Sequence, residues 1–446
     1  MPSKFKNAIG QDQKEIFTDC NVSTASTEGR LIAVNNSFLA MAWANVGEIV
    51  VVDSSKPCRM KLDQPRIKGR RSNVLDLEFS PFSSDLLASA YDDCAILLHQ
   101  IPKDGLTTHM TKELQIYHKH SKKVPLVTFN PIASDVISSG AFSGEIHIWN
   151  ALKADSYCEL KADETPTWLQ WSPNGASLGC TTKNKFMNIF DARSKNMTFK
   201  KQITEGFQAS KFTWIDNEQF AVVGWNKLGN KELKLWDVRN QEKEVTLFKI
   251  DNSKTVSTPY VDRESQLLYV IGKGENSTHI FDYSEGKFIK GINYSSKEPS
   301  ICSVMFERRC MDYNKLEVDR FARYVNSHKV YYVSFSIPRR NPGYDPTLYP
   351  PVDIGEAVLT YDEWVSGKNG EAKKKPIDTI ENKFVSKIDE KQVQKATTEE
   401  KTVTKTDKSN DDKIKELKEK YAQLTSQFNQ LNEENAKLKK ELESLG

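Results

Sequence analysis

The sequence predicts an all-β propeller of seven blades, followed by a C-terminal extension, a disordered linker and an α-helical coiled coil. Short β-branched or aromatic runs broken by Pro, Gly, Ser and Asp, as in Lys122–Asn150, indicate antiparallel strands joined by tight turns. Strands that end in a large apolar and a short polar residue recur about 41 to 51 residues apart, close to the roughly 40–45 residues of a WD-repeat blade. The recurring pairs are Val52-Asp53, Leu98-His99, Trp149-Asn150, Phe190-Asp191, Trp236-Asp237 and Phe281-Asp282.

Length and composition fit this architecture. The 446 residues leave room for about seven blades and one smaller element, and one such sheet must stack radially on others to bury both faces.

With 63 Lys+Arg against 60 Asp+Glu, any basic binding surface must be local. Seven cysteines without C-x-x-C spacing indicate free thiols in a reducing compartment. Neither a signal peptide nor an apolar run near 18 residues is present, so we expect a cytoplasmic protein without a membrane span.

The N-terminal half shows how the repeats begin. Residues 3–6 form a short predicted strand that would complete the last blade and remove its open edge. The first blade covers residues 32–53. A basic turn follows at residues 66–71, which is either a solvated loop or part of a binding surface. The second and third blades cover residues 74–100 and 122–150.

WD repeats usually link a His before the blade, an Asp in a turn and a Trp at a strand end by buried hydrogen bonds. The second blade keeps Asp93 but has Arg70 at the His position and His99 at the Trp position. The third blade keeps its His and Trp but has Ser143 in place of Asp. We therefore expect degenerate repeats held mainly by packing.

Catalytic and metal-binding motifs are not evident. His118-Lys119-His120 lacks further ligands at supporting spacing, and His120 already fits the structural position before the third blade. Gly272-Lys273-Gly274 lacks the remaining residues of a phosphate-binding loop and is interpreted as a turn. No nucleophile elbow or H-E-x-x-H is present. We expect no enzymatic activity, no cofactor and, because the basic clusters lack interleaved aromatics, no nucleic-acid binding.

The C-terminal half contains four more blades and three further segments. The blades are expected at residues 167–193, 212–239, 256–283 and 302–336, so the propeller covers residues 1–336. Residues 337–370 are rich in Pro and aromatics and are predicted to pack on the propeller. Residues 371–411 carry mixed charges and few large apolar side chains, and are predicted to be a disordered linker.

Residues 412–446 are predicted to form a coiled coil of about five heptads. Every d position is Leu, and Asn435 at an a position would pair with its own copy in a parallel arrangement, although the flanking charges alone do not decide the direction. We expect a parallel homotrimer or homodimer; the alternative is an amphipathic helix docked on its own propeller. The a and d residues are Ile414, Leu417, Tyr421, Leu424, Phe428, Leu431, Asn435, Leu438, Leu442 and Leu445.

Several short motifs give the chain a family resemblance. They are Ser3-Lys4-Phe5, Val74-Leu75-Asp76, Asp93-Cys94, Ile101-Pro102, Gly105-Leu106-Thr107, residues 269–274 (YVIGKG), Ser296-Lys297-Glu298-Pro299, Leu348-Tyr349-Pro350 and residues 363–367 (EWVSG). In these motifs, over about residues 3–370, the chain resembles the coronins, WD-repeat proteins of the actin cytoskeleton. Two positions depart from the usual coronin pattern: Lys6-Asn7 replaces Arg-His, and Asn21 replaces a basic residue.

The resemblance implies a protein of the cell cortex that binds filamentous actin and influences the actin-branching (actin-related protein) complex. Coiled-coil oligomerisation would bundle filaments, since linking weak contacts can raise apparent affinity by about 10² to 10⁴. The alternative is a WD-repeat adaptor or scaffold for trafficking or substrate recruitment. The candidate actin-binding residues are Lys4, Lys6, Arg66, Lys68, Arg70, Arg71, Lys122 and Lys123.

Overall fold

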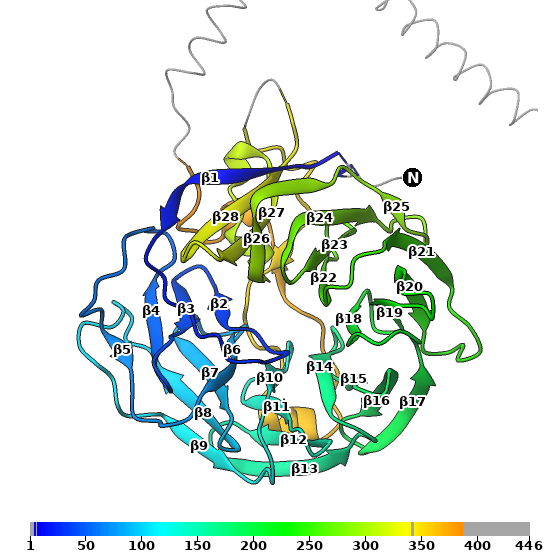
Figure 1. Cartoon of the computed structure of the whole chain (residues 1–446), viewed down its shortest axis with the longest axis horizontal. Coiled ribbons are helices and arrows are strands. Elements are labelled where there is room, and N and C mark those ends of the chain that lie inside the picture. The colour runs from blue at the N-terminus through cyan, green and yellow to red at the C-terminus, as the bar shows by residue number, and fades with distance from the viewer. Residues whose placement is uncertain (1–3, 6, 340–342, 387–446) are drawn as a thin grey trace, which may run out of the picture. The chain divides into compact units, whose positions relative to one another are not determined.

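The structure, a computed structural model, describes residues 4–5, 7–339 and 343–386. Their strands form antiparallel sheets arranged as the blades of a propeller around a central axis (Figure 1). The all-β propeller predicted from the repeats is therefore confirmed. The expected coiled coil, residues 412–446, and most of the expected linker lie outside the described residues.

Five of the sheets are separate four-stranded blades. The first comprises β2 (Ile32–Val34), β3 (Phe38–Ala42), β4 (Ile49–Asp53) and β5 (Arg66–Ile67), and the second β6 (Val74–Phe79), β7 (Leu86–Tyr91), β8 (Ala95–Gln100) and β9 (Gln115–His118). The third comprises β10 (Leu126–Phe129), β11 (Val136–Gly140), β12 (Glu145–Asn150) and β13 (Asp155–Lys161). The fourth comprises β14 (Pro166–Trp171), β15 (Ser177–Thr182), β16 (Phe186–Asp191) and β17 (Asn196–Gln202), and the fifth β18 (Lys211–Trp214), β19 (Gln219–Trp225), β20 (Lys231–Asp237) and β21 (Thr246–Asp251).

The last two blades share one eight-stranded sheet. Blade six contains β22 (Ser257–Asp262), β23 (Leu267–Gly272), β24 (Glu275–Asp282) and the short β25 (Ile289–Lys290), and blade seven contains β26 (Tyr294–Met305), β27 (Glu317–Val325), β28 (Lys329–Ser336) and β1 (Ile9–Phe17). The long β26 joins the two blades, because its first half pairs with β24 and its second half with β27.

Burial decreases from the axis to the rim. Strands near the axis, such as β3, β10 and β23, are buried along their whole length because neighbouring blades cover both of their faces. The outer strands β13, β17 and β21 are largely exposed. The core therefore lies between the blades, and the loops at the two ends of the ring remain for binding partners.

The N-terminus closes the ring. β1 pairs with β28 from Ile9–Ser336 to Phe17–Val330, and so supplies the outer strand of blade seven. Closure by an N-terminal strand was predicted, but the prediction that residues 3–6 form that strand was wrong. Lys4 and Phe5 lie in a turn, where Phe5 is buried and the Arg308 guanidinium lies 5.3 Å from its ring centroid.

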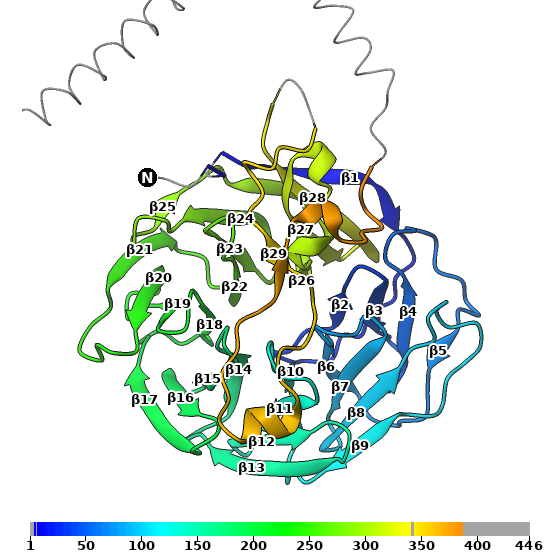
Figure 2. The same ribbon diagram turned by 180° about the vertical axis from the view of Figure 1, so that it is seen from behind.

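After β28 the chain crosses one end of the propeller, as Figure 2 shows. This segment, the arm, comprises the described residues from Ile337 to Ser386 and contains β29 (Val352–Asp353), α1 (Tyr361–Val365), β30 (Lys374–Lys375) and η3 (Ile377–Thr379). Two further 3₁₀ turns, η1 (Arg308–Cys310) and η2 (Tyr313–Lys315), precede β27. Throughout the described ranges, no helix is both long and apolar enough to cross a membrane.

The arm extends further than the sequence predicted. Residues 371–386 were expected to be disordered, but they return across the propeller: Ile377 is fully buried, and the Phe384 ring packs 5.4 Å from that of Phe306. The expectation was wrong for these residues because two isolated apolar side chains anchor a segment whose average composition is polar.

The arm distinguishes the two ends of the propeller. The Ser134 amide donates to the Leu359 carbonyl at 2.9 Å, the Trp364 indole donates to the Gly175 carbonyl at 2.8 Å, and Lys374 pairs with Glu264 at 3.0 Å. The three propeller partners lie in loops that join the first and second strands of their blades. We call this end the arm face. The opposite end, formed by the loops between second and third strands and by the connections between blades, is the open face.

Candidate functional site

Two basic connections meet on the open face. One, residues 68–73, leads from β5 to β6, and the other, residues 119–125, leads from β9 to β10. The turn of blade two lies between them. The carboxylate of Asp92 accepts hydrogen bonds from Ser72 and from the Asn73 amide, and lies 3.7 Å from the Lys123 ammonium. One acidic turn therefore holds both basic connections next to each other.

Two of the predicted actin-binding arginines are structural. Arg66, in β5, is buried: it pairs with Glu48 at 2.7 Å, donates to the Leu62 carbonyl at 2.9 Å and lies over the Trp43 ring at 5.2 Å. Because its donors are directed into the blade, it is not available to a partner.

Arg70 has a comparable role in blade two. Its guanidinium pairs with Asp93 and lies 5.7 Å from the Tyr91 ring centroid. It thus occupies the position at which a WD repeat usually has His and supplies the partner of the turn Asp. At the other end of the blade, His99 hydrogen-bonds Ser89 at 2.8 Å. The two substituted residues preserve two separate parts of the usual network.

Three predicted cations remain accessible and lie together. Arg71 and Lys122 are exposed, and neither has an ion-pair partner among the described residues. Lys123 is 59% exposed despite its contact with Asp92. Lys68 is less available, since it is one-third exposed and lies 3.5 Å from Glu48. We call Arg71, Lys122 and Lys123 the basic cluster.

The other predicted site residues are elsewhere. Lys4 lies on the arm, where its ammonium donates to the Thr347 carbonyl at 3.1 Å, so the structure does not bring it to the basic cluster. Lys6 lies outside the described residues. So do the ten predicted oligomerisation residues, Ile414, Leu417, Tyr421, Leu424, Phe428, Leu431, Asn435, Leu438, Leu442 and Leu445.

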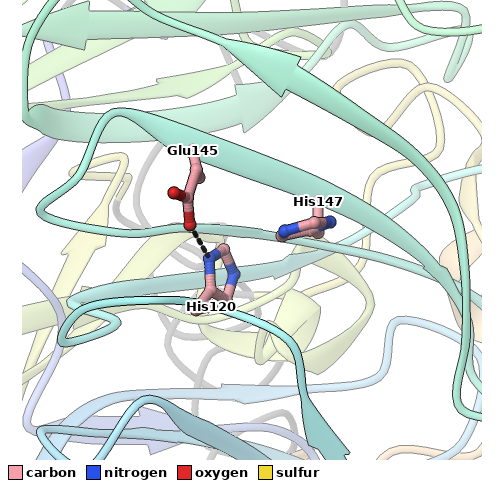
Figure 3. Close-up of side chains that lie close together, drawn as sticks. All are labelled: His120, Glu145 and His147. Atoms are coloured by element: carbon pink, nitrogen blue, oxygen red, sulfur yellow. Dashed lines mark ion pairs between the residues drawn. The ribbon is translucent and has the colours of Figure 1, made fainter.

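The histidine of blade three, His120, lies next to Glu145 and His147 (Figure 3) and belongs to a hydrogen-bond network. Trp149 donates its indole N–H to the Ser139 hydroxyl at 2.9 Å, and that hydroxyl hydrogen-bonds His120 Nε2 at 2.6 Å. The opposite ring nitrogen, Nδ1, faces the Glu145 carboxylate at 3.8 Å. Glu145 therefore supplies the carboxylate that Ser143 lacks. The sequence pattern did not reveal this role, because Glu145 stands two residues beyond the expected position.

His147 packs against this network, with its ring centroid 4.6 Å from that of His120. Burial and the neighbouring His147 lower the pKa of His120 to about 3, so the ring is neutral at physiological pH. His147 Nδ1 hydrogen-bonds Ser156 at 3.0 Å, and Ser121 donates to Glu145 at 2.8 Å. His120, Glu145 and His147 lie close enough together to hold a metal ion. Because hydrogen bonds within the blade engage all three side chains, we assign them a structural role.

A second group of potential metal ligands surrounds a lysine. The buried Lys231 ammonium lies 2.7 Å from Glu275 and 3.7 Å from Asp251, and His279 lies 3.1 Å from the same aspartate. The ammonium already supplies the positive charge that these carboxylates require. This group joins β20 to β24 across two blades and has a structural role.

A cavity of about 650 Å³ lies between the arm and the propeller. Its charged lining is paired: Arg309 contacts Glu307 at 2.5 Å, and Lys374 contacts Glu264 at 3.0 Å. The Lys374–Glu264 pair fastens the arm to the propeller, and both pairs bring opposite charges together in the lining. The basic cluster on the open face, by contrast, is an accessible group of charges of one sign that could recruit a macromolecule.

Two family models match parts of the chain. Residues 1–59 match a domain of unknown function (DUF1899), and residues 330–372 match a type of WD40 repeat. The first match covers β1 and most of blade one. The second covers most of β28 and the arm through α1 to residue 372, so the two matches include both strands that close the ring, β1 and β28.

Curated relatives match over most of the chain. A coronin-like protein of Schizosaccharomyces pombe is 26% identical over 381 residues, and coronin-2A of Bos taurus is 25% identical over 383. Each match covers 83% of this chain, but 63% and 73% of the respective relative. A coronin-like protein of Saccharomyces cerevisiae is 24% identical, with 59% of its length covered. The chain thus spans less than two thirds of the two yeast relatives.

Solved structures agree with these matches. The WD40 domain of Toxoplasma gondii coronin superposes with a TM-score of 0.81 at 28% identity, covering 84% of this chain and 98% of that domain. A chain of the mitotic checkpoint complex superposes with a TM-score of 0.57 at 15% identity, which shows the propeller fold alone. The coronin-type motifs and the agreement in both sequence and structure lead to one conclusion: over most of its length this chain is similar to the coronins.

Proposed function

We propose that this protein binds actin filaments through the open face of its propeller, with Arg71, Lys122 and Lys123 as basic contacts. The observation that supports this is the position of the basic cluster: three exposed cations on neighbouring connections, at the end of the ring that the arm leaves uncovered. Actin filaments are strongly acidic, so such a cluster favours association electrostatically. The coronin family is the context in which a filament is the expected partner.

The rigidity of the face supports this proposal. Asp92 fixes both connections through Ser72, Asn73 and Lys123, and the Arg70–Asp93 pair holds the base of the first connection. Cations held in one arrangement lose less conformational entropy on binding than cations on a mobile loop. Because exposed charges a Debye length apart are largely screened at physiological salt, filament binding should weaken as ionic strength rises.

The second part of the proposal concerns valence. Residues 412–446, outside the described part of the chain, carry the heptad pattern predicted to form a parallel homotrimer or homodimer. Linking two or three propellers would allow one oligomer to contact two filaments, and so to bundle them. We propose further that the protein modulates actin dynamics at the cell cortex, including the activity of the actin-branching complex, as a non-catalytic cytoplasmic protein.

An adaptor role is the alternative. A propeller with one accessible face could recruit a trafficking or degradation substrate, and the coil could then bind a different protein instead of its own copies. One observation favours this alternative. Arg66 and Arg70 form ion pairs inside the fold, so the basic surface available to actin is smaller than the sequence suggested.

Filament co-sedimentation tests the proposal. The full chain and a chain ending at Asn410 are mixed with filaments and centrifuged at low and at high force. The full chain is expected to pellet filaments at low force, whereas the shorter chain binds more weakly and bundles nothing. A mass measurement on the full chain complements this result, because a monomer that still bundles filaments would contradict the role given to the coil.

If neither protein pellets with filaments, the proposed function fails and the adaptor role becomes the better account. If both bundle filaments equally, the propeller alone must contain two filament contacts. The valence mechanism would then be wrong, although filament binding itself would stand.

A further inference from the structure

Two apolar side chains protrude from the open face at blade five. Phe207, in the connection from β17 to β18, is 99% exposed, and Leu228, in the turn between β19 and β20, is 85% exposed. The two loops are neighbours, since the Glu205 and Gly206 amides both donate to the Trp225 carbonyl. Single exposed apolar residues are common, but two at the tips of adjacent loops form a patch that calls for an explanation.

Lysines surround this patch. The Lys185 ammonium donates to the Phe207 carbonyl at 3.0 Å, and Lys227 is 3.4 Å from Glu205. Lys254 lies beside the Leu228 turn, since a Cβ placed on Gly229 would meet its ammonium at 2.6 Å. Lys183 is exposed in the same turn as Lys185.

The nearby acids neutralise only part of this charge. Glu205 pairs with Lys227, and Glu28 lies 3.9 Å from the buried Lys211, which belongs to the interior. The lysines at the patch therefore outnumber the carboxylates available to them. The patch therefore consists of two apolar loop tips surrounded by a positively charged rim.

The backbone holds the two tips outward. The Asn226 side chain accepts hydrogen bonds from the Leu228 and Asn230 amides, and Gly229 has a φ of +78°, in the left-handed region that favours glycine. The Phe207 loop is fixed by the two bonds to the Trp225 carbonyl and by Lys185. The fold therefore presents Phe207 and Leu228 to solvent in a defined arrangement.

The chemistry of this patch fits an anionic lipid surface. Both tips project from the surface, since the Phe207 and Leu228 side chains are almost fully exposed and neither lines the cavity under the arm. A protein partner would need a complementary pocket for each tip, whereas fluid lipid chains rearrange around any side chain that inserts between them. Phenylalanine and leucine side chains lower their free energy by leaving water for the headgroup–acyl boundary, and the lysines around them attract anionic headgroups.

We propose that this patch, Phe207 and Leu228 with Lys183, Lys185, Lys227 and Lys254, docks the propeller on anionic membranes. The two apolar tips insert at the headgroup boundary, and the lysines remain at the level of the phosphates. The patch lies on blades four and five and the basic cluster on the connections around blade two, so this membrane contact is separate from the proposed filament contact.

Vesicle sedimentation with the full chain tests the proposal. The vesicles are phosphatidylcholine alone, or phosphatidylcholine with about 30% phosphatidylserine to give an anionic surface. The full chain is expected to bind the anionic vesicles, less so at high salt, and to leave the neutral ones in large part unbound. The double variant F207S/L228S is expected to lower the partition coefficient about tenfold or more. Each of K183Q, K227Q and K254Q is expected to lower it about fivefold.

Leu62 provides a matched control, because it is fully exposed but lies in the loop between β4 and β5, away from the patch. L62S should bind anionic vesicles as the unaltered chain does. All these substitutions are at exposed positions, and an unchanged thermal unfolding midpoint verifies that each variant is folded.

Three results would overturn the proposal. The first is that the full chain does not bind anionic vesicles. The second is that F207S/L228S binds them as well as L62S does. The third is that F207S/L228S retains vesicle binding but no longer pellets with filaments, which would make the patch a protein contact.

Discussion

The fastening of the arm can be tested at Trp364. This side chain, in α1, is fully buried and packs against Tyr157 of blade three and Trp171 of blade four. Its indole donates to the Gly175 carbonyl at 2.8 Å, its ring lies 5.8 Å from that of Trp171, and the Arg193 guanidinium lies 5.6 Å from its centroid. Trp364→Ala should therefore release the arm from the propeller.

The magnitude follows from these contacts. Truncating a buried Trp to Ala costs about 3–5 kcal/mol through lost transfer free energy and the cavity left behind. Trp364→Phe keeps most of the apolar surface but removes one of the two donors to the Gly175 carbonyl, which the Asn130 side-chain amide still reaches at 2.9 Å, so the loss is about 0.5–1.5 kcal/mol. Because α1 spans only Tyr361–Val365 at the surface of the ring, the loss should appear mainly as local release of the arm and not as unfolding of the blades.

Limited trypsin digestion and hydrogen exchange can measure this release. In W364A, cleavage after Lys368 and exchange of the amides in residues 355–372 should accelerate by about two orders of magnitude or more, since 1.4 kcal/mol is tenfold. W364F should give an intermediate increase. L62A, which removes a fully exposed side chain, is the control and should leave both rates unchanged.

An unchanged cleavage rate in W364A would refute the reasoning, because it would mean that Trp364 does not hold the arm. Simultaneous loss of exchange protection in the blades and the arm would also contradict it. That result would make the arm an integral part of the propeller core and not a separately fastened segment.

Three further predictions concern the blades. S139A should lower the free energy of unfolding by about 1–3 kcal/mol in urea, because Trp149 and His120 lose their shared partner, whereas S143A should change it by less than about 0.5 kcal/mol. Burial lowers the pKa of His99 to about 4, so between pH 6.5 and about 4 only the unfolded chain binds a proton at this position. The free energy of unfolding should therefore fall as the pH is lowered through that range. H99N should reduce the slope of the free energy of unfolding against pH by up to about 1.4 kcal/mol per pH unit. Deleting residues 1–17 removes β1 and exposes the edge of β28, so the shortened chain should elute as aggregates in size-exclusion chromatography.

The strands near the axis could be predicted from the sequence because burial on both faces leaves apolar or small residues along their whole length. The outer strand β1 could not be predicted, since most of Ile9–Phe17 is exposed and its pairing with β28 depends on backbone hydrogen bonds. The returning part of the arm was missed for a similar reason. Ile377 and Phe384 are single anchors without a period, in a segment rich in lysine.

The site was less predictable than the fold. A run of four cations in residues 66–71 gives no indication of which ones are paired, because Glu48 and Asp93 come from turns elsewhere in the sequence. The protruding Phe207 and Leu228 were also missed. A lone apolar residue between polar neighbours fits an exposed loop tip as well as a buried anchor, and only the three-dimensional arrangement separates the two.

The most direct test of the account is filament binding by a chain without the basic cluster. R71Q/K122Q/K123Q is compared in high-force co-sedimentation with the unaltered chain and with K243Q/K249Q, which changes two exposed lysines near the outer edge of blade five. The account predicts that the triple variant binds filaments at least about tenfold more weakly at physiological salt and loses most of its salt dependence, whereas the control binds normally. Equal binding by the triple variant and the control would contradict the assignment of the filament contact to this part of the open face.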